Sequence, residues 1–260
     1  MTPEQFIKLG KDGYNHVPVV RTMFADMDTP LSCYVKVARG PYSYLLESAA
    51  QGGEKWARYS LVGLPSDCVV KITGDEITLE ESGEVTDQFR VEDPLAFVEE
   101  FQARYSYPEL QNLPIYTGGL VGYFGYDTIR YVEKKISQSA PPDTLGTPDI
   151  ILMVSNDVIV FDNVLGRIHL ITHADPAVDG SFDLAQARLQ QMTQDLQTNV
   201  PKDLHGPVRG PRLHEADFVS NYGEEAYKAD VEKIKDYIVE GDVMQVVLAQ
   251  RMSVAFESDP

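Results

Sequence analysis

A helix pattern followed by an apolar run near the end of the chain constrains the fold more than any other stretch. Within residues 224–239, apolar residues recur at helical spacing while charged residues fill the other faces: Tyr227, Val231, Ile234 and Ile238. Gly241 stands where a glycine commonly ends a helix. The next run, Val243–Met252, is apolar on both faces that a strand presents, since side chains alternate along a strand. The pattern predicts a helix, a turn and a strand buried on both sides in a sheet.

Polar residues interrupt this apolar run. Gln245 and Arg251 share one face of the expected strand, and Gln250 lies on the other. A buried glutamine without hydrogen-bond partners costs about 1–3 kcal/mol, so Gln245 must be satisfied by something. It is either a structural residue bonded to a neighbouring loop or a residue that lines a cavity.

The rest of the chain alternates between strand and helix patterns. The expected strands are 31–37, 42–48, 57–63, 69–73, 76–79, 149–161 and 167–173, with a tight turn at Gly74-Asp75. The expected helices begin near Thr2-Pro3, at Asp93-Pro94 and at Asp179 or Ser181. Residues 15–21 read as a loop or a short extended piece, and the acidic run 80–87 as a solvated loop. These patterns predict an α+β fold with largely antiparallel sheets and packed helices.

Proline and glycine are concentrated between residues 198 and 214, which indicates a linker. We therefore expect a first region over residues 1–197 and the start of a second domain over residues 215–260. The net charge of −18 and the pI of about 4.6 argue against nucleic acid or an anionic membrane as a partner. An anionic ligand must then be met by local positive groups.

No apolar run approaches the roughly 20 residues of a membrane span, and the N-terminus lacks the pattern of a signal peptide. Cys33 and Cys68 are too few for a disulfide framework. We therefore expect a cytoplasmic protein.

Glycines and aromatic residues alternate between Gly118 and Asp127. The spacing does not fit a dinucleotide-binding turn, and no acidic residue follows at the distance that such a site needs. We expect the glycines to permit close packing of the backbone. Farther along, His169 and His173 lie on one face of an expected strand but about 13 Å apart, which is too far for a shared metal ion.

Four segments together resemble anthranilate synthase component I, a chorismate-utilising enzyme: Leu45–Ser48, Trp56–Ser60, Gly118–Asp127 and Tyr237–Arg251. In the wider family of chorismate-utilising enzymes, isochorismate and salicylate synthases carry a lysine where Gln245 stands, and the lysine activates water. Anthranilate and aminodeoxychorismate synthases carry a glutamine there and use ammonia. The resemblance implies that Gln245 is a catalytic residue.

The same resemblance implies a site for tryptophan, the feedback inhibitor. Glu47 and Ser48 match the acidic and hydroxyl positions of that site, and Arg58 matches a basic position. Glu47 can pair with the ammonium of a free amino acid, and Arg58 or Ser48 with its carboxylate. The alternative is that Glu47 and Arg58 merely pair with each other across adjacent strands.

For the whole enzyme, the resemblance implies an anthranilate synthase-like fold and a role in tryptophan biosynthesis. Chorismate and ammonia, the latter from a glutamine amidotransferase subunit, would become anthranilate and pyruvate. The ligands of its Mg²⁺ are expected beyond residue 260, with none within this chain. We therefore expect the chain to be an inactive part of a longer protein, with an incomplete catalytic domain. Two alternatives stay open: aminodeoxychorismate synthase component I of the folate pathway, and a non-catalytic tryptophan-binding module.

Overall fold

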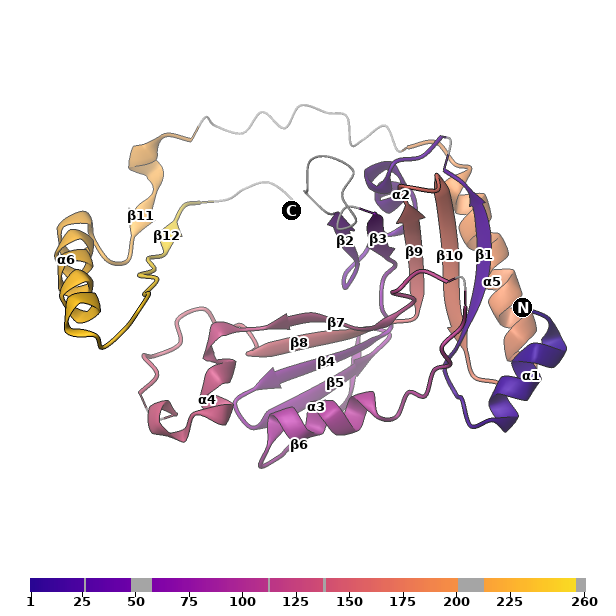
Figure 1. Ribbon diagram of the computed structural model, residues 1–260, viewed down its shortest axis with the longest axis horizontal. Helices are drawn as coiled ribbons and strands as arrows, with labels where there is room; N and C mark the ends of the chain where they lie inside the picture. Colours follow the sequence, from indigo (N-terminus) through magenta and orange to yellow (C-terminus); the bar gives the residue numbers. More distant parts are fainter. Residues whose placement is uncertain (26, 48–57, 112, 138, 201–212, 256–260) are drawn as a thin grey trace. The chain divides into compact units, whose positions relative to one another are not determined.

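The computed structural model describes the chain except for residues 26, 48–57, 112, 138, 201–212 and 256–260 (Figure 1). It divides into two compact units, Met1–Pro201 and Lys202–Pro260. The first unit holds two five-stranded antiparallel sheets with helices packed on them, which confirms the predicted α+β class. None of the described helices is long and apolar enough to cross a membrane.

The first sheet has the strand order β1-β10-β9-β3-β2. Its strands are β1 (Val17–Phe24), β10 (Arg167–Ala174), β9 (Asp157–Asp162), β3 (Tyr59–Gly63) and β2 (Tyr44–Glu47). The helices α1 (Pro3–Lys11), α2 (Pro30–Val37) and α5 (Ser181–Leu196) supply side chains to the core on one face, and Figure 1 shows α5 alongside β1 and β10. That core includes Phe6, Val19, Val62, Ile159, Leu170 and Leu189. On the other face, Val158, Val160 and Ile171 form a smaller buried cluster.

The second sheet has the order β6-β5-β4-β8-β7. Its strands are β6 (Glu84–Arg90), β5 (Glu76–Glu81), β4 (Cys68–Thr73), β8 (Ile150–Ser155) and β7 (Gly119–Phe124). The helix α3 (Pro94–Gln102) packs on it through Phe97 and Phe101, and Asp93 caps its first turn as predicted. The expected single strand over residues 149–161 is two strands, because β8 passes into β9 of the first sheet at Asn156.

Two predictions of local structure in the first unit are wrong. Residues 31–37 form helix α2 and not a strand, because Thr29 and Ser32 make a capping box and Pro30 occupies the first turn. The acidic run 80–87 is not a loop: it completes β5 and begins β6, with the turn at Ser82 and Gly83 in the left-handed region. β6 is an edge strand with exposed side chains, so its charges stay in water.

The glycine-rich run allows the close backbone packing that its sequence predicts. Gly122 lies in β7 directly against β8, and a Cβ atom there would stand 1.8 Å from the carbonyl oxygen of Ile151. Gly118 leaves room for the ring of His173, whose Cε1 atom would stand 2.5 Å from an added Cβ. Side chains at these two positions would collide with neighbouring atoms.

A 3-10 turn (η2, Tyr126–Thr128), a short helix (α4, Ile129–Val132) and a second 3-10 turn (η3, Lys134–Ile136) follow β7. The second unit contains η5 (Glu215–Asp217), β11 (Val219–Ser220), α6 (Glu224–Glu240) and β12 (Met252–Ser253). The predicted helix is confirmed as α6, and Gly241 ends it with a φ of 85°. The Asp242 N–H donates to the Tyr237 carbonyl at 3.0 Å, as in a Schellman ending.

The strand predicted over residues 243–252 is wrong. This stretch has irregular backbone until Met252, and Met244 and Val247 are 99% and 82% exposed. A strand buried on both faces needs hydrogen-bonded neighbours and covering layers. Within the described part of the second unit, only the pair β11–β12 forms, over Val219–Ser220 and Met252–Ser253.

Candidate functional site

The ends of β2 and β3 carry two of the three residues expected to bind an amino acid. Glu47 is the last residue of β2, is exposed, and makes no ion pair among the described residues. It lies opposite Ser60 of β3. Arg58 directly precedes β3, and Ser48 lies outside the described residues.

Arg58 is held by Asp162, the last residue of β9. Its Nε donates to both carboxylate oxygens at 3.1 Å, and its Nη2 donates to Oδ2 at 2.6 Å. The guanidinium also lies 4.9 Å from the centre of the Tyr59 ring. Arg58 therefore pairs with Asp162 and not with Glu47.

Asp162 also links Arg58 to the turn between β9 and β10. Its Oδ1 accepts hydrogen bonds from the backbone N–H groups of Val164 and Leu165 at 3.1 and 3.0 Å. Burial alone would raise the pKa of Asp162, but the hydrogen bonds from Arg58 and the turn outweigh it and hold the pKa below its usual value. Asp162 is thus an ionised carboxylate with only 2% of its side chain exposed. The sequence patterns did not single out Asp162.

The two charged residues of the expected site do not meet on one face of the sheet. Glu47 shares a face with Ser60, and the neighbouring pair Leu45–Val62 contributes to the core beneath the helices. Asp162 lies opposite Tyr59, which packs on the cluster of the other face. The end of Arg58 that reaches Asp162 therefore lies on the side away from Glu47.

A buried hydroxyl cluster fixes the beginning of β2. The Tyr44 hydroxyl lies 2.7 Å from Ser155 Oγ and 3.1 Å from the Tyr116 hydroxyl. The Tyr44 ring covers Gly63, where an added Cβ would stand 1.9 Å from a ring carbon. Burial raises the pKa of Tyr44 far above its ordinary value, so this phenol stays protonated and serves as a hydrogen-bonding anchor.

Two stacked histidines lie where β1 begins and β10 ends. The rings of His16 and His173 are 4.2 Å apart and nearly parallel, and Tyr105 meets His16 edge-on. His173 Nδ1 lies 2.9 Å from the Asn156 carbonyl, which can only accept, so Nδ1 carries the hydrogen. Burial, together with the neighbouring His173, lowers the pKa of His16 to about 3, and burial also lowers the pKa of His173. Both rings are therefore neutral near pH 7.

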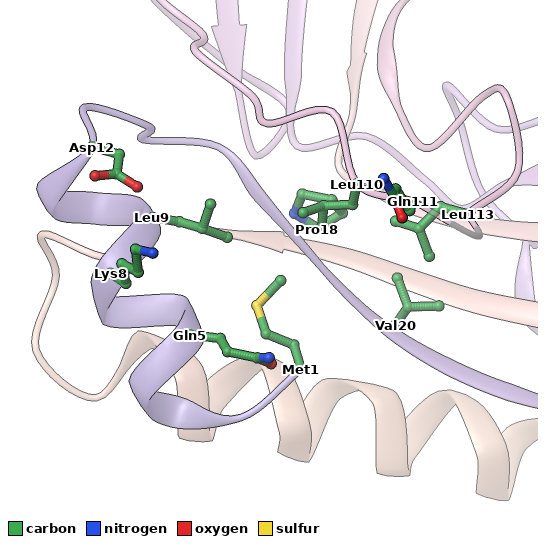
Figure 2. A pocket seen from close by; sticks show the side chains of 10 residues that line it. All are labelled: Met1, Gln5, Lys8, Leu9, Asp12, Pro18, Val20, Leu110, Gln111 and Leu113. Carbon is green, nitrogen blue, oxygen red and sulfur yellow. The ribbon is translucent and has the colours of Figure 1, made fainter.

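A groove of about 410 Å³ lies at the opposite edge of the first sheet from β2 (Figure 2). Leu9 of α1, Pro18 and Val20 of β1, and Leu110 and Leu113 supply its apolar lining. Gln5, Lys8 and Asp12 border it along one side of α1. It can accept an apolar group, but it contains none of the residues that the sequence singled out.

Gln245 is exposed on the irregular stretch of the second unit. Across the described residues, no group of three or more His, Cys, Asp or Glu side chains is arranged to hold a metal ion.

Comparison with known proteins gives one consistent result. Residues 42–260 match the family described as chorismate binding enzyme. The chain is 48% identical to anthranilate synthase component 1 of Pseudomonas putida over 260 residues, which are 100% of this chain and 52% of that protein. It is 43% identical to the Neisseria gonorrhoeae protein of the same name over 264 residues, again with 100% and 52% covered.

A solved structure agrees with these relatives. The crystal structure of anthranilate synthase component I from Streptococcus pneumoniae TIGR4 superposes with a TM-score of 0.59 at 28% identity. The match covers 92% of this chain and 50% of the other. The chain thus spans about half the length of the curated relatives that it matches.

Proposed function

Because the chain belongs to the family of chorismate binding enzymes, we propose that it is part of an anthranilate synthase component I. The whole protein would convert chorismate and ammonia to anthranilate and pyruvate in the cytoplasm. It would use Mg²⁺ and receive its ammonia from a glutamine amidotransferase subunit. The observation that carries this proposal is the 48% identity to such a component along the full length of the chain.

We assign feedback regulation by tryptophan to residues 1–197 and the beginning of the chorismate-binding domain to residues 215–260, with a linker between them. Glu47 supports the regulatory assignment because it is an exposed carboxylate, without an ion-pair partner among the described residues, at the end of an edge strand. It is available to an ammonium group, and the hydroxyl of Ser48 would supply a neighbouring hydrogen bond.

We assign the choice of nucleophile to Gln245. The amide of glutamine does not titrate in the useful range and cannot act as a general base. Ammonia is nucleophilic without one, whereas water needs a base such as a lysine whose pKa is lowered by burial. In the whole protein, Gln245→Lys is expected to lower anthranilate formation and to permit some attack by water.

Product analysis tests the enzyme assignment. The whole protein that contains this chain is incubated with chorismate, ammonium and Mg²⁺, and the products are separated and identified. Anthranilate with pyruvate is the expected result, and aminodeoxychorismate without pyruvate would assign the protein to the folate branch instead. The 260-residue chain alone is expected to give no anthranilate, since Gln245 is exposed there.

Calorimetric titration with L-tryptophan tests the regulatory assignment. Wild-type chain is expected to bind, and Glu47→Ala to bind about ten- to a hundredfold more weakly through the loss of one charge-assisted contact. Glu84→Ala removes an exposed carboxylate at the distant edge strand β6 and serves as the control. Equal binding by all three proteins would refute the role of Glu47.

A further inference from the structure

The two sheets of the first unit meet at the stacked rings of His16 and His173. Each sheet has its own buried core, and no described residue belongs to the cores of both. The position of one sheet against the other therefore depends on the contacts where they meet. We propose that the stacked pair is an acid-sensitive joint between the sheets. It holds them together while both rings are neutral, and it opens locally as the pH falls below about 6.5, before either sheet unfolds.

His173 belongs to the first sheet but is partly enclosed by the second. It lies in β10, and its Nδ1 donates at 2.9 Å to the carbonyl of Asn156, where β8 of the second sheet passes into β9 of the first. Gly118, directly before β7 of the second sheet, leaves room for the ring, because an added Cβ there would stand 2.5 Å from its Cε1. A shift of the second sheet would therefore uncover this ring.

His16 makes the matching contacts from the beginning of β1. Its ring meets Tyr105 edge-on with the centres 5.0 Å apart, and Tyr105 packs against Phe101 in the core of the second sheet. The backbone N–H of His16 donates to the Ser106 carbonyl at 3.0 Å, and the Ser106 N–H donates to Asn15 Oδ1 at 2.7 Å. The end of the α3 segment is thus fastened to the beginning of β1 beside the stacked rings.

A proton on either ring is incompatible with this stack. It would place a charge in a half-buried contact, and protons on both rings would place two like charges in rings 4.2 Å apart. An exposed histidine titrates near pH 6.5, whereas the pKa of His16 in the closed joint is about 3. The open joint therefore binds protons that the closed joint excludes. Closure is fully favoured above pH 6.5, and opening gains with each step below it.

The charged groups around the rings do not remove this effect. Arg104 and Asp175 line, together with both rings, an open pocket of about 280 Å³, through which protons reach the rings from solvent. Asp157 favours a proton on His173, yet burial outweighs it, and the pKa of that ring is lowered. Burial raises the pKa of Tyr105 to about 12, so its phenol stays neutral. Residues 117–120, on the side of β7, carry no charge.

A second tie between the sheets does not respond to acid. The Tyr44 hydroxyl of β2 lies 2.7 Å from Ser155 Oγ at the end of β8. Burial raises the pKa of Tyr44 far above its ordinary value, so this phenol keeps its proton at every pH below neutral. The sheets therefore stay fastened at this point while the histidine joint opens, which makes the opening a local movement.

Amide hydrogen exchange of the full 260-residue chain reports on the joint, because three of its hydrogen bonds hold the amides of Asn15, His16 and Ser106. Exchange is measured at pH 7 and pH 5, with and without a low concentration of urea. Each rate is divided by that of an unstructured peptide at the same pH, which gives a protection factor. The amides of Ile159 in β9 and Val70 in β4 report on the two sheets themselves.

The protection factors of the three joint amides are expected to fall by about 25-fold or more between pH 7 and pH 5, the factor for one ring that titrates near 6.5 only when the joint is open. They should change little with urea, because a local opening exposes little surface. The amides of Ile159 and Val70 should be far better protected and should respond steeply to urea, because they exchange through unfolding of the sheets.

Variants assign the pH response to the two rings. His16→Phe keeps a flat ring in the stack without a titrating group, and His173→Asn keeps an N–H donor near the Asn156 carbonyl. His16→Phe should shrink the pH response by at least about tenfold, and the double variant should reduce it to within about twofold. His169→Gln is the matched control. His169 is also buried in β10, but its ring bonds to Thr22 of the first sheet, so this variant should keep the wild-type response.

A fall of less than about threefold at the joint amides of the wild-type chain would overturn the proposal. Protection and urea dependence equal to those of Ile159 and Val70 would overturn it as well, since the rings would then be exposed only by unfolding of the sheets. An undiminished pH response in His16→Phe would show that other groups carry it. This last comparison decides the matter even where the double variant does not fold.

Discussion

Residues 1–200 and residues 213–255 both have apolar residues at helix and strand spacing, but the two regions bury these side chains to very different extents. The first region has three clusters of buried apolar side chains, with Ile72, Ile159 and Leu189 fully enclosed. In the second, α6 has no buried residue, and Val239 is 86% exposed. Helix α6 forms because its hydrogen bonds and its glycine ending are local, whereas the apolar run after it requires strands from elsewhere. Local signals thus suffice for a helix but not for a buried strand.

The two regions should differ most in how much stability they lose when an apolar side chain is truncated. Leu189→Ala in α5 should lower the free energy of unfolding by about 3–4 kcal/mol, because it leaves a cavity in a closed core. Ile238→Ala in α6, where the side chain is 43% exposed, should cost less than about 1 kcal/mol. Urea unfolding followed by circular dichroism measures both, and equal costs would remove the contrast between the regions.

The glycine-rich run should be intolerant of a single added carbon. Gly122→Ala drives a Cβ against the backbone of β8, which cannot swing aside, and should cost about 3 kcal/mol. In Gly119→Ala, in the same strand, the added Cβ meets no atom within 4 Å, so the change should be milder. Its φ of 139° still disfavours a side chain, and we expect a cost of about 1 kcal/mol. Thermal melts of the two variants compare them. A Gly122→Ala protein that melts like the parent would show that the close packing is not required.

Acid should weaken the first region through its stacked histidines. A histidine in the unfolded chain titrates near pH 6.5, whereas the pKa of His16 in the folded chain is about 3. The stability that the neutral ring of His16 contributes is therefore complete above pH 6.5 and is lost as the pH falls toward 3. The free energy of unfolding should fall by no more than about 1.4 kcal/mol per pH unit over this range. His16→Gln should flatten this slope in urea unfolding measured from pH 7 to pH 4. His214→Gln, an exposed site in the other region, should leave the slope unchanged.

The smallest expected effect is local to α6. Gly241→Ala places a side chain at a φ of 85° and should cost about 1 kcal/mol at the end of the helix. Amide exchange in the last turn of α6 should accelerate, while exchange in β9 and β10 stays the same. Acceleration in both regions would mean that they unfold together.

The sequence predicted the fold class, the hairpin at Gly74-Asp75, the caps of α1 and α3, and the close packing at Gly122, because each depends on neighbouring residues. The helix over residues 30–37 was missed because an alternating apolar pattern outweighed the capping box at Thr29. The site was predictable only in part. That Glu47 ends a strand follows from its own segment, but the pairing of Arg58 with Asp162 joins residues 104 positions apart. Such a partner is visible only after the register of β3 and β9 is known.

Hydrogen exchange of the 260-residue chain, with and without L-tryptophan, tests the central claim that residues 1–200 hold both the closed core and the amino-acid site. The account predicts slow exchange in β9 and β10, fast exchange over residues 243–251, and added protection at β2 and the start of β3 when tryptophan is present. Protection of residues 243–251 equal to that of β9 would contradict the difference between the regions. Protection by tryptophan at the α1 groove, with none at β2, would contradict the proposed site.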